Sequence, residues 1–153
     1  METLSRVTRA EAEIFQKARH LSTDQGYIFK IGKTMSDFLP DEDILLLRSA
    51  GLLHDGDFLT VACKGGGYDG HGRYGFGNNG MVVIVAHESK KDFSLPQYLL
   101  TPVGRELAGL IDPKPNLDYF AALKEHFASK EGYQLTFLDS KDKEVAIDPR
   151  GAK

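Results

Sequence analysis

The residues best suited to chemistry lie in one glycine-rich stretch, residues 64–80, KGGGYDGHGRYGFGNNG, which holds eight of the chain's 16 glycines. Within it, residues 70–75 spell G-x-G-x-x-G. This pattern holds the pyrophosphate of a dinucleotide only where it follows a strand and opens a helix. Here it leads instead into β-type residues that begin at Met81, and no lysine of the stretch is followed by serine or threonine. The stretch therefore does not predict a phosphate cradle.

Three interpretations of this stretch stay open. Arg73 lies among aromatic residues on a glycine-rich backbone, which is typical of tips that stack on bases and contact phosphate. A tip of this kind also folds onto protein partners. The third interpretation is a loop that only joins two strands, although loops longer than about 12–15 residues are usually functional or disordered. The candidate contact residues of this hairpin and its flanks are Lys64, Tyr68, His71, Arg73, Tyr74, Phe76, Lys90 and Lys91.

A histidine–aspartate pair forms the second candidate site. His54 and Asp55, with Asp57 nearby, resemble the metal-binding pair of HD-domain phosphohydrolases, in which a bound divalent ion activates water. In that family the pair lies within a helix, whereas here it follows Gly51, a helix-stopping residue, and leads into a strand. We favour a polar turn, and we predict no metal, cofactor or catalytic residue. The other histidines, His20, His71, His87 and His126, fall at no ligand spacing.

The composition is that of a globular protein. The chain has 153 residues, of which 41% are hydrophobic and 27% charged, enough for one domain, which we place at residues 1–138. It contains no apolar run of the roughly 20 residues that a membrane span needs, and its first residues lack the apolar region of a signal peptide. The single cysteine, Cys63, lies in an alternating string and is expected to be a buried, inert thiol. We therefore expect a cytoplasmic protein without a membrane partner.

Charge is unevenly distributed along the chain, whose formal net charge is −3. Residues 36–57 carry six acidic side chains against one basic side chain, whereas residues 64–105 carry five basic against three acidic. If any part of the protein meets phosphate groups, we expect it to be the second segment.

The first half of the chain predicts two helices and three strands. Thr8 and Glu11 form a capping box, which begins a helix over residues 9–21, and a short strand follows over 27–31. A second helix is expected from Pro40 to Ala50, with Gly51 as its stop. The two clearest strands are residues 58–64 and 81–88, and we predict that they pair as a hairpin across the glycine-rich stretch.

The second half predicts two further helices and a last strand. A few extended residues, 97–100, precede a helix that Thr101 caps, with Pro102 in its first turn. Asn116 is expected to cap the next helix, whose buried face is Phe120, Leu123 and Phe127. Residues 133–138 alternate as a strand, and from Asp139 to the end of the chain we expect a frayed tail.

The order of these elements resembles a known fold. A string of leucines that ends in Gly51-Leu52-Leu53, a hairpin, and then Tyr98-Leu99-Leu100-Thr101-Pro102-Val103-Gly104-Arg105-Glu106-Leu107 are similar to the second half of a winged-helix domain in MarR- and PadR-like regulators. This resemblance covers residues 44–110 and implies a DNA-binding helix and a wing. The helix that would enter the groove, however, begins with three carboxylates, Asp41, Glu42 and Asp43, which would face phosphate groups.

Residues 8–138 also resemble an uncharacterised family of bacterial and prophage proteins, in which similar elements, with a Leu-Thr-x-x-Gly-Arg-Glu-Leu helix, form the C-terminal portion of a longer chain. We predict an α+β, winged-helix-like domain with a long glycine-rich hairpin and a C-terminal helix–strand extension. The predicted function is a non-catalytic binding module of a bacterial or phage protein, contacting a protein or a nucleic acid through the hairpin at residues 64–91. A DNA-binding regulator and a metal-dependent phosphohydrolase that uses His54 and Asp55 are the alternatives.

Overall fold

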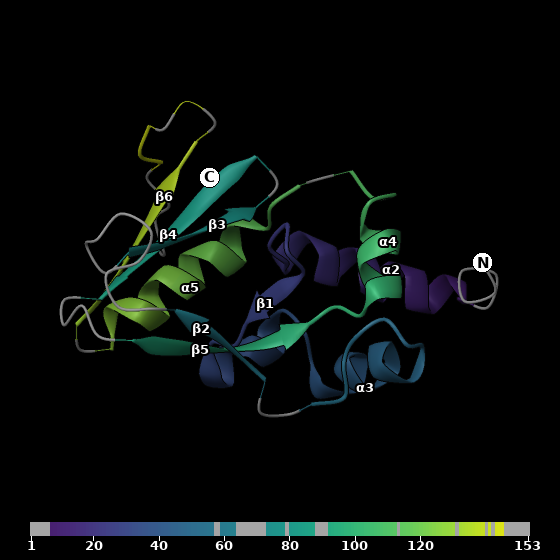
Figure 1. Ribbon diagram of the computed structural model, residues 1–153. Coiled ribbons are helices and arrows are strands. Elements are labelled where there is room, and N and C mark those ends of the chain that lie inside the picture. The colour runs from purple at the N-terminus through teal and green to yellow at the C-terminus, as the bar shows by residue number, and fades with distance from the viewer. Residues whose placement is uncertain are drawn as a thin grey trace.

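The computed structural model describes residues 7–56, 59–63, 73–78, 80–87, 92–112, 114–130, 132–139, 141 and 143–145. Helices and two three-stranded antiparallel sheets make up an α+β fold, as predicted (Figure 1). No helix of the described residues is both long enough and apolar enough to span a membrane. The elements in chain order are α2 (Arg9–Leu21), β1 (Tyr27–Phe29), the 3-10 helix η1 (Gly32–Asp37), α3 (Asp41–Ser49), β2 (Thr60–Cys63), β3 (Arg73–Asn78), β4 (Met81–His87), β5 (Phe93–Leu99), α4 (Pro102–Ala108), α5 (Leu117–Ala128) and β6 (Tyr133–Leu138).

The helices begin where their capping residues predicted. The Thr8 hydroxyl accepts a hydrogen bond from the Glu11 amide at 3.1 Å, and the Glu11 carboxylate accepts one from the Thr8 amide at 3.0 Å. The Asn116 side chain accepts a hydrogen bond from the Tyr119 amide at 3.1 Å, which starts α5. Because these bonds satisfy backbone N–H groups that a helix leaves free, they fix its first turn. The 3-10 helix η1 was not predicted.

The predicted pairing of residues 58–64 with 81–88 is wrong. Strand β2 instead pairs with β5, and the first sheet has the order β1-β5-β2. Strand β4 pairs with β3 and β6 in the second sheet. The reason is that the glycine-rich stretch contains a strand of its own, β3, joined to β4 by two residues between Asn78 and Met81. Gly80, the second residue of this connection, has a φ of 88°, as a type I′ hairpin turn requires at that position.

The two sheets share one hydrophobic core with α5, which lies between them (Figure 1). Phe76 of β3 packs edge-on against Phe29 of β1, with ring centroids 5.0 Å apart. On α5, the buried Tyr119 hydroxyl donates a 2.7 Å hydrogen bond to the Phe29 carbonyl oxygen, and Phe120 packs against Phe137 of β6. Helix α5 therefore contacts both sheets, and Phe76 adds a second link between them.

The residues just after β6 turn back toward it, so the prediction of a frayed tail from Asp139 is wrong for its first residues. The Asp139 carboxylate accepts hydrogen bonds from the Lys141 and Lys143 amides at 2.8 and 2.9 Å, which closes a turn. The Val145 amide then donates to the Phe137 carbonyl at 2.8 Å. The remainder of the predicted tail, 146–153, lies outside the described residues.

Candidate functional site

Of the eight predicted hairpin contact residues, the structure describes the side chains of two, Tyr74 and Phe76. Lys64, Tyr68, His71, Lys90 and Lys91, and the side chain of Arg73, lie outside the part of the chain that it describes. Tyr74 is half-buried, and its ring lies 5.5 Å from that of Phe76. Phe76 is only 2% exposed, so its prediction as a surface contact is wrong: it alternates inward along β3 into the core.

The His54–Asp55 pair follows α3 in a turn whose backbone is held by Leu99 and by the Arg48 side chain. The His54 amide donates to the Leu99 carbonyl at 2.9 Å, and the Arg48 guanidinium donates to the His54 and Gly56 carbonyls at 3.0 and 3.3 Å. Both His54 and Asp55 are exposed, and Asp57 lies outside the described residues. Among the residues that are described, no group of three His, Cys, Asp or Glu side chains is placed to hold a metal ion.

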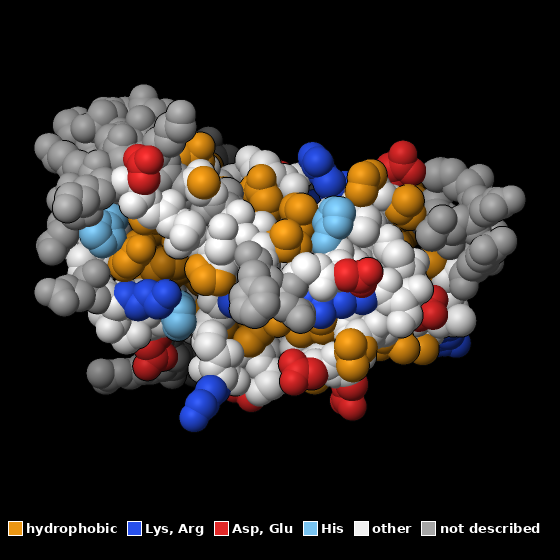
Figure 2. Space-filling view, turned by 60° about the horizontal axis from the view of Figure 1, so that its bottom comes forward, with side chains coloured by type: hydrophobic (Ala, Val, Ile, Leu, Met, Phe, Trp, Pro, Cys, Tyr) orange, Lys and Arg blue, Asp and Glu red, His pale blue; other side chains and the backbone are white. Residues whose placement is uncertain are grey.

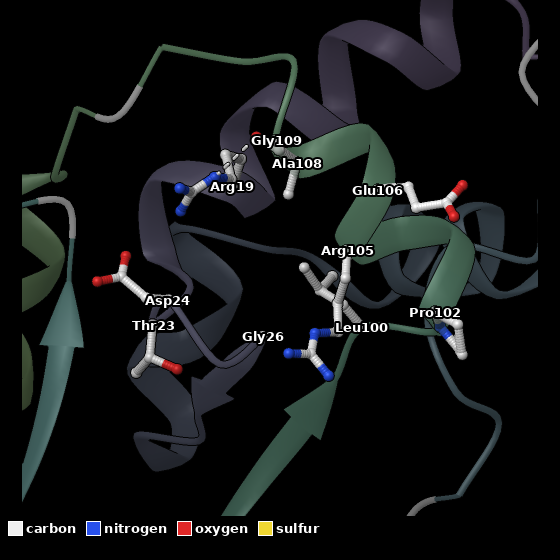
Figure 3. A pocket seen from close by; sticks show the side chains of 10 residues that line it. All are labelled: Arg19, Thr23, Asp24, Gly26, Leu100, Pro102, Arg105, Glu106, Ala108 and Gly109. Carbon is white, nitrogen blue, oxygen red and sulfur yellow. Dashed lines mark hydrogen bonds between the residues drawn. The ribbon is translucent and has the colours of Figure 1, made fainter.

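A pocket that the sequence did not predict lies between the end of α2, the turn that follows it, and α4 (Figure 3). Its volume is about 470 Å³. The residues that line it come from two stretches of the chain, 19–26 and 100–109, and two of them are arginines, one on each helix. The lining residues are Arg19, Thr23, Asp24, Gly26, Leu100, Pro102, Arg105, Glu106, Ala108 and Gly109.

The Thr-x-x-Gly-Arg motif positions α4 beside this pocket. The Thr101 hydroxyl donates to the Gly51 carbonyl at 2.6 Å and accepts a hydrogen bond from the Gly104 amide at 3.0 Å. A Cβ atom on Gly104 would overlap the Leu52 carbonyl oxygen, so only glycine allows this close approach. Thr101 and Gly104 thereby clamp the first turn of α4 to the Gly51–Leu52 turn, and Arg105 follows directly.

Gly26 provides the surface on which the Arg105 side chain lies. Gly26 has a φ of 91°, and a Cβ atom built on it would lie 3.3 Å from Cγ and 3.5 Å from Cδ of Arg105. The aliphatic part of the Arg105 side chain therefore packs against the backbone of Gly26. Within the described part of the chain, the Arg105 guanidinium has no hydrogen-bond or ion-pair partner, and the residue is exposed. A cation of this kind is available to a ligand.

Arg19 is half-buried and held on the α2 side of the pocket. Its Nε donates to the Ala108 carbonyl at 3.2 Å, and its Nη1 donates to the Ser22 hydroxyl at 3.4 Å. These bonds tie the end of α2 to the end of α4. They leave the other N–H groups of the guanidinium unused by the described residues. The sequence offered one signal for this pocket, the Gly-Arg pair of the motif, because Arg19 and Gly26 carry no recognisable pattern.

Two histidines outside the pocket have a pKa below the ordinary value of 6.5. Burial lowers the pKa of His126 most, and Lys130 lowers it further. Burial also lowers the pKa of His20, with Lys114 and Arg19 adding to the effect. For Tyr119, burial raises the pKa, so its hydroxyl stays protonated as a hydrogen-bond donor.

The His126 shift predicts a pH dependence of stability. As the pH falls below the ordinary value of about 6.5, the unfolded chain takes up the His126 proton before the folded protein does, so acid favours unfolding. We expect the free energy of unfolding to decrease between pH 7.5 and pH 5.5, and less steeply in His126→Gln. Urea unfolding at both pH values measures this. An equal decrease in the free energy of unfolding for the two proteins would show that His126 does not contribute to the pH dependence.

Comparison with known proteins places the chain in one family. No curated protein and no solved structure matches it. The model of one protein family matches residues 29–124, from β1 into α5, a span that includes Arg105 and excludes Arg19. Because this match covers more than half of the 153 residues, the chain belongs to the family described as "Protein of unknown function (DUF2806)".

Proposed function

We propose that this chain is a non-catalytic binding module of winged-helix type that binds a partner protein. The order of elements α2, β1, η1, α3, β2, β5 and α4, with β5 between β1 and β2, supports the winged-helix part of the proposal. In this arrangement β2 and β5 are the two strands of the wing. Residues 64–91 join them, which supports the proposal that this segment belongs to the contact surface.

The exposed face of α3 is the observation that carries the proposal. In winged-helix regulators the corresponding helix enters the DNA groove. Here Asp41 and Glu42 are exposed on it, and Leu45 is 61% exposed. Figure 2 shows acidic and apolar side chains mixed on the side of the molecule where α3 lies in Figure 1.

Two basic groups near this face, Arg48 and Lys17, are already engaged. Arg48, the one cation of α3, donates to the His54 and Gly56 carbonyls, and Lys17 of α2 forms a 3.0 Å ion pair with Asp43. Phosphate groups of DNA need such cations, whereas protein interfaces combine an apolar centre with a polar rim. The partner that fits is therefore a protein with an apolar recess edged by lysine or arginine.

Leu45→Ser tests the proposal against a matched control, Leu110→Ser. Leu110 is 72% exposed and lies past the end of α4, away from α3 in the sequence. A partner would first be captured from host lysate and identified, and its affinity would then be measured with purified proteins. We expect Leu45→Ser to weaken binding about tenfold or more, as for a leucine at an interface centre, and Leu110→Ser to leave it unchanged. Equal affinities for both variants would contradict the proposal.

Oligonucleotide titration separates this function from DNA binding. The purified protein is expected to show no binding to single- or double-stranded oligonucleotides at low salt, by fluorescence anisotropy. Binding whose affinity falls steeply with salt and increases in Asp41→Asn would favour the DNA-binding regulator instead.

A further inference from the structure

We propose that the pocket between α2 and α4 is a binding site for a small organic phosphate, held by Arg19 and Arg105. This site goes beyond the proposed protein-binding function and does not rest on it, because it involves neither α3 nor residues 64–91. Figure 3 shows Arg19 of α2 and Arg105 of α4 lining the same pocket, with the turn that carries Thr23 and Asp24 across from α4.

The stem of Arg105 and the guanidinium of Arg19 are held in place before any ligand binds. The stem of Arg105 packs on Gly26, and its helix is clamped by Thr101 and Gly104. Arg19 is fixed by hydrogen bonds to Ala108 and Ser22 that use only part of its guanidinium. Prepositioned arginines lose little side-chain entropy on binding, and their forked donors match the oxygens of phosphate.

The size of the pocket fits a small organic molecule. A volume of about 470 Å³ lies within the range of small-molecule sites, about 300–1,000 Å³, and exceeds what one anionic group fills. Leu100, Pro102 and Ala108 line the same space and offer apolar contact to an organic portion. The ligand is therefore larger than an inorganic ion.

The two positive charges of the pocket fit a phosphate monoester. Two guanidinium groups on separate helices suit a phosphate monoester, which carries about −1.5 to −2 charge and three acceptor oxygens at pH 7. A single carboxylate would be satisfied by one arginine. Asp24 and Glu106 also line the pocket, and both are exposed. Their negative charge disfavours an extended polyanion such as a nucleic-acid backbone, and the single anionic group of a small ligand is expected to lie at the guanidinium groups and away from these carboxylates.

The test is a titration of the whole chain followed by nitrogen-15 NMR, with the amides of Gly26 and Gly109 as reporters. The probes are inorganic phosphate, adenosine 5′-monophosphate and acetate. We expect saturable shifts of both amides with the two phosphates, binding of the monophosphate at least tenfold tighter than of inorganic phosphate, and no saturation with acetate. Acetate binding as tight as that of phosphate would overturn the phosphate assignment. A monophosphate that binds no tighter than inorganic phosphate would overturn the organic one.

Three variants locate the site. Arg105→Gln keeps the side-chain stem on Gly26 and is expected to lower the affinity for the monophosphate at least tenfold. Arg105→Lys keeps the positive charge but lacks the forked N–H donors of arginine, and it is expected to bind the monophosphate with intermediate affinity. Arg9→Gln, at the opposite end of α2 and 93% exposed, is the matched control and is expected to bind like the parent. Equal losses of affinity for the monophosphate in Arg9→Gln and Arg105→Gln, with the amide spectra otherwise unchanged, would show that general charge attraction explains the binding. This result would overturn the proposal.

Discussion

Phe76→Ala is expected to lower the free energy of unfolding by about 3–5 kcal/mol, the range for removing a large aromatic side chain from a core. Phe76 is 2% exposed, and its ring packs edge-on against Tyr27 and Phe29 at centroid distances of 6.2 and 5.0 Å. Its loss removes an apolar link between β3 and β1, in different sheets, and leaves a cavity that neither sheet closes by itself. Urea unfolding of the whole chain measures the change.

Leu110→Ala is the control for this measurement. Leu110 is 72% exposed, and we expect its truncation to change the stability by no more than about 0.5 kcal/mol. If Phe76→Ala is as stable as Leu110→Ala but binds a partner more weakly, Phe76 belongs to the contact surface, as the sequence predicted.

The misplacement of Phe76 has a physical explanation. Its glycine-rich surroundings conceal the period-2 alternation of Tyr74, Phe76 and Asn78, which marks β3. Asn79-Gly80, the strongest short signal for a hairpin, stands at the end of the stretch. The intervening Gly77 has a packing role, because a Cβ atom there would lie 2.6 Å from the Asp24 carboxylate. Gly77 therefore fits a strand that passes close to the turn at Asp24.

Local sequence signals predicted the helices and strands well, but they did not predict which strands pair. Caps at Thr8, Thr101 and Asn116 placed three helix starts, and alternation placed β6 at its observed bounds. Strand partners depend instead on which segments meet in space. Strand β2 pairs with β5, which follows about thirty residues later in the chain, and neither strand has a sequence pattern that identifies its partner. The pocket was missed for the same reason, since Arg105 lies far along the chain from Arg19 and Gly26.

Gly104→Ala is expected to destabilise the protein by about 3 kcal/mol, the upper part of the range for overpacking. The added Cβ would overlap the Leu52 carbonyl oxygen, which belongs to backbone and cannot rotate away. Helix α4 would have to shift, which weakens the hydrogen bonds of Thr101 to the Gly51 carbonyl at 2.6 Å and the Leu52 carbonyl at 3.1 Å. The higher helix propensity of alanine returns only about 1 kcal/mol.

Gly109→Ala provides the matched control at the other end of the same helix. Gly109 has an ordinary helical φ of −64°, and the nearest atom to its added Cβ would be the Glu106 carbonyl oxygen at 3.3 Å. We expect its stability to stay within about 1 kcal/mol of the parent. Because the Gly104→Ala shift also carries Arg105 away from Gly26, that variant should lose affinity for adenosine 5′-monophosphate together with stability. A Gly104→Ala protein that matches Gly109→Ala in both measurements would show that α4 is not clamped to the Gly51–Leu52 turn.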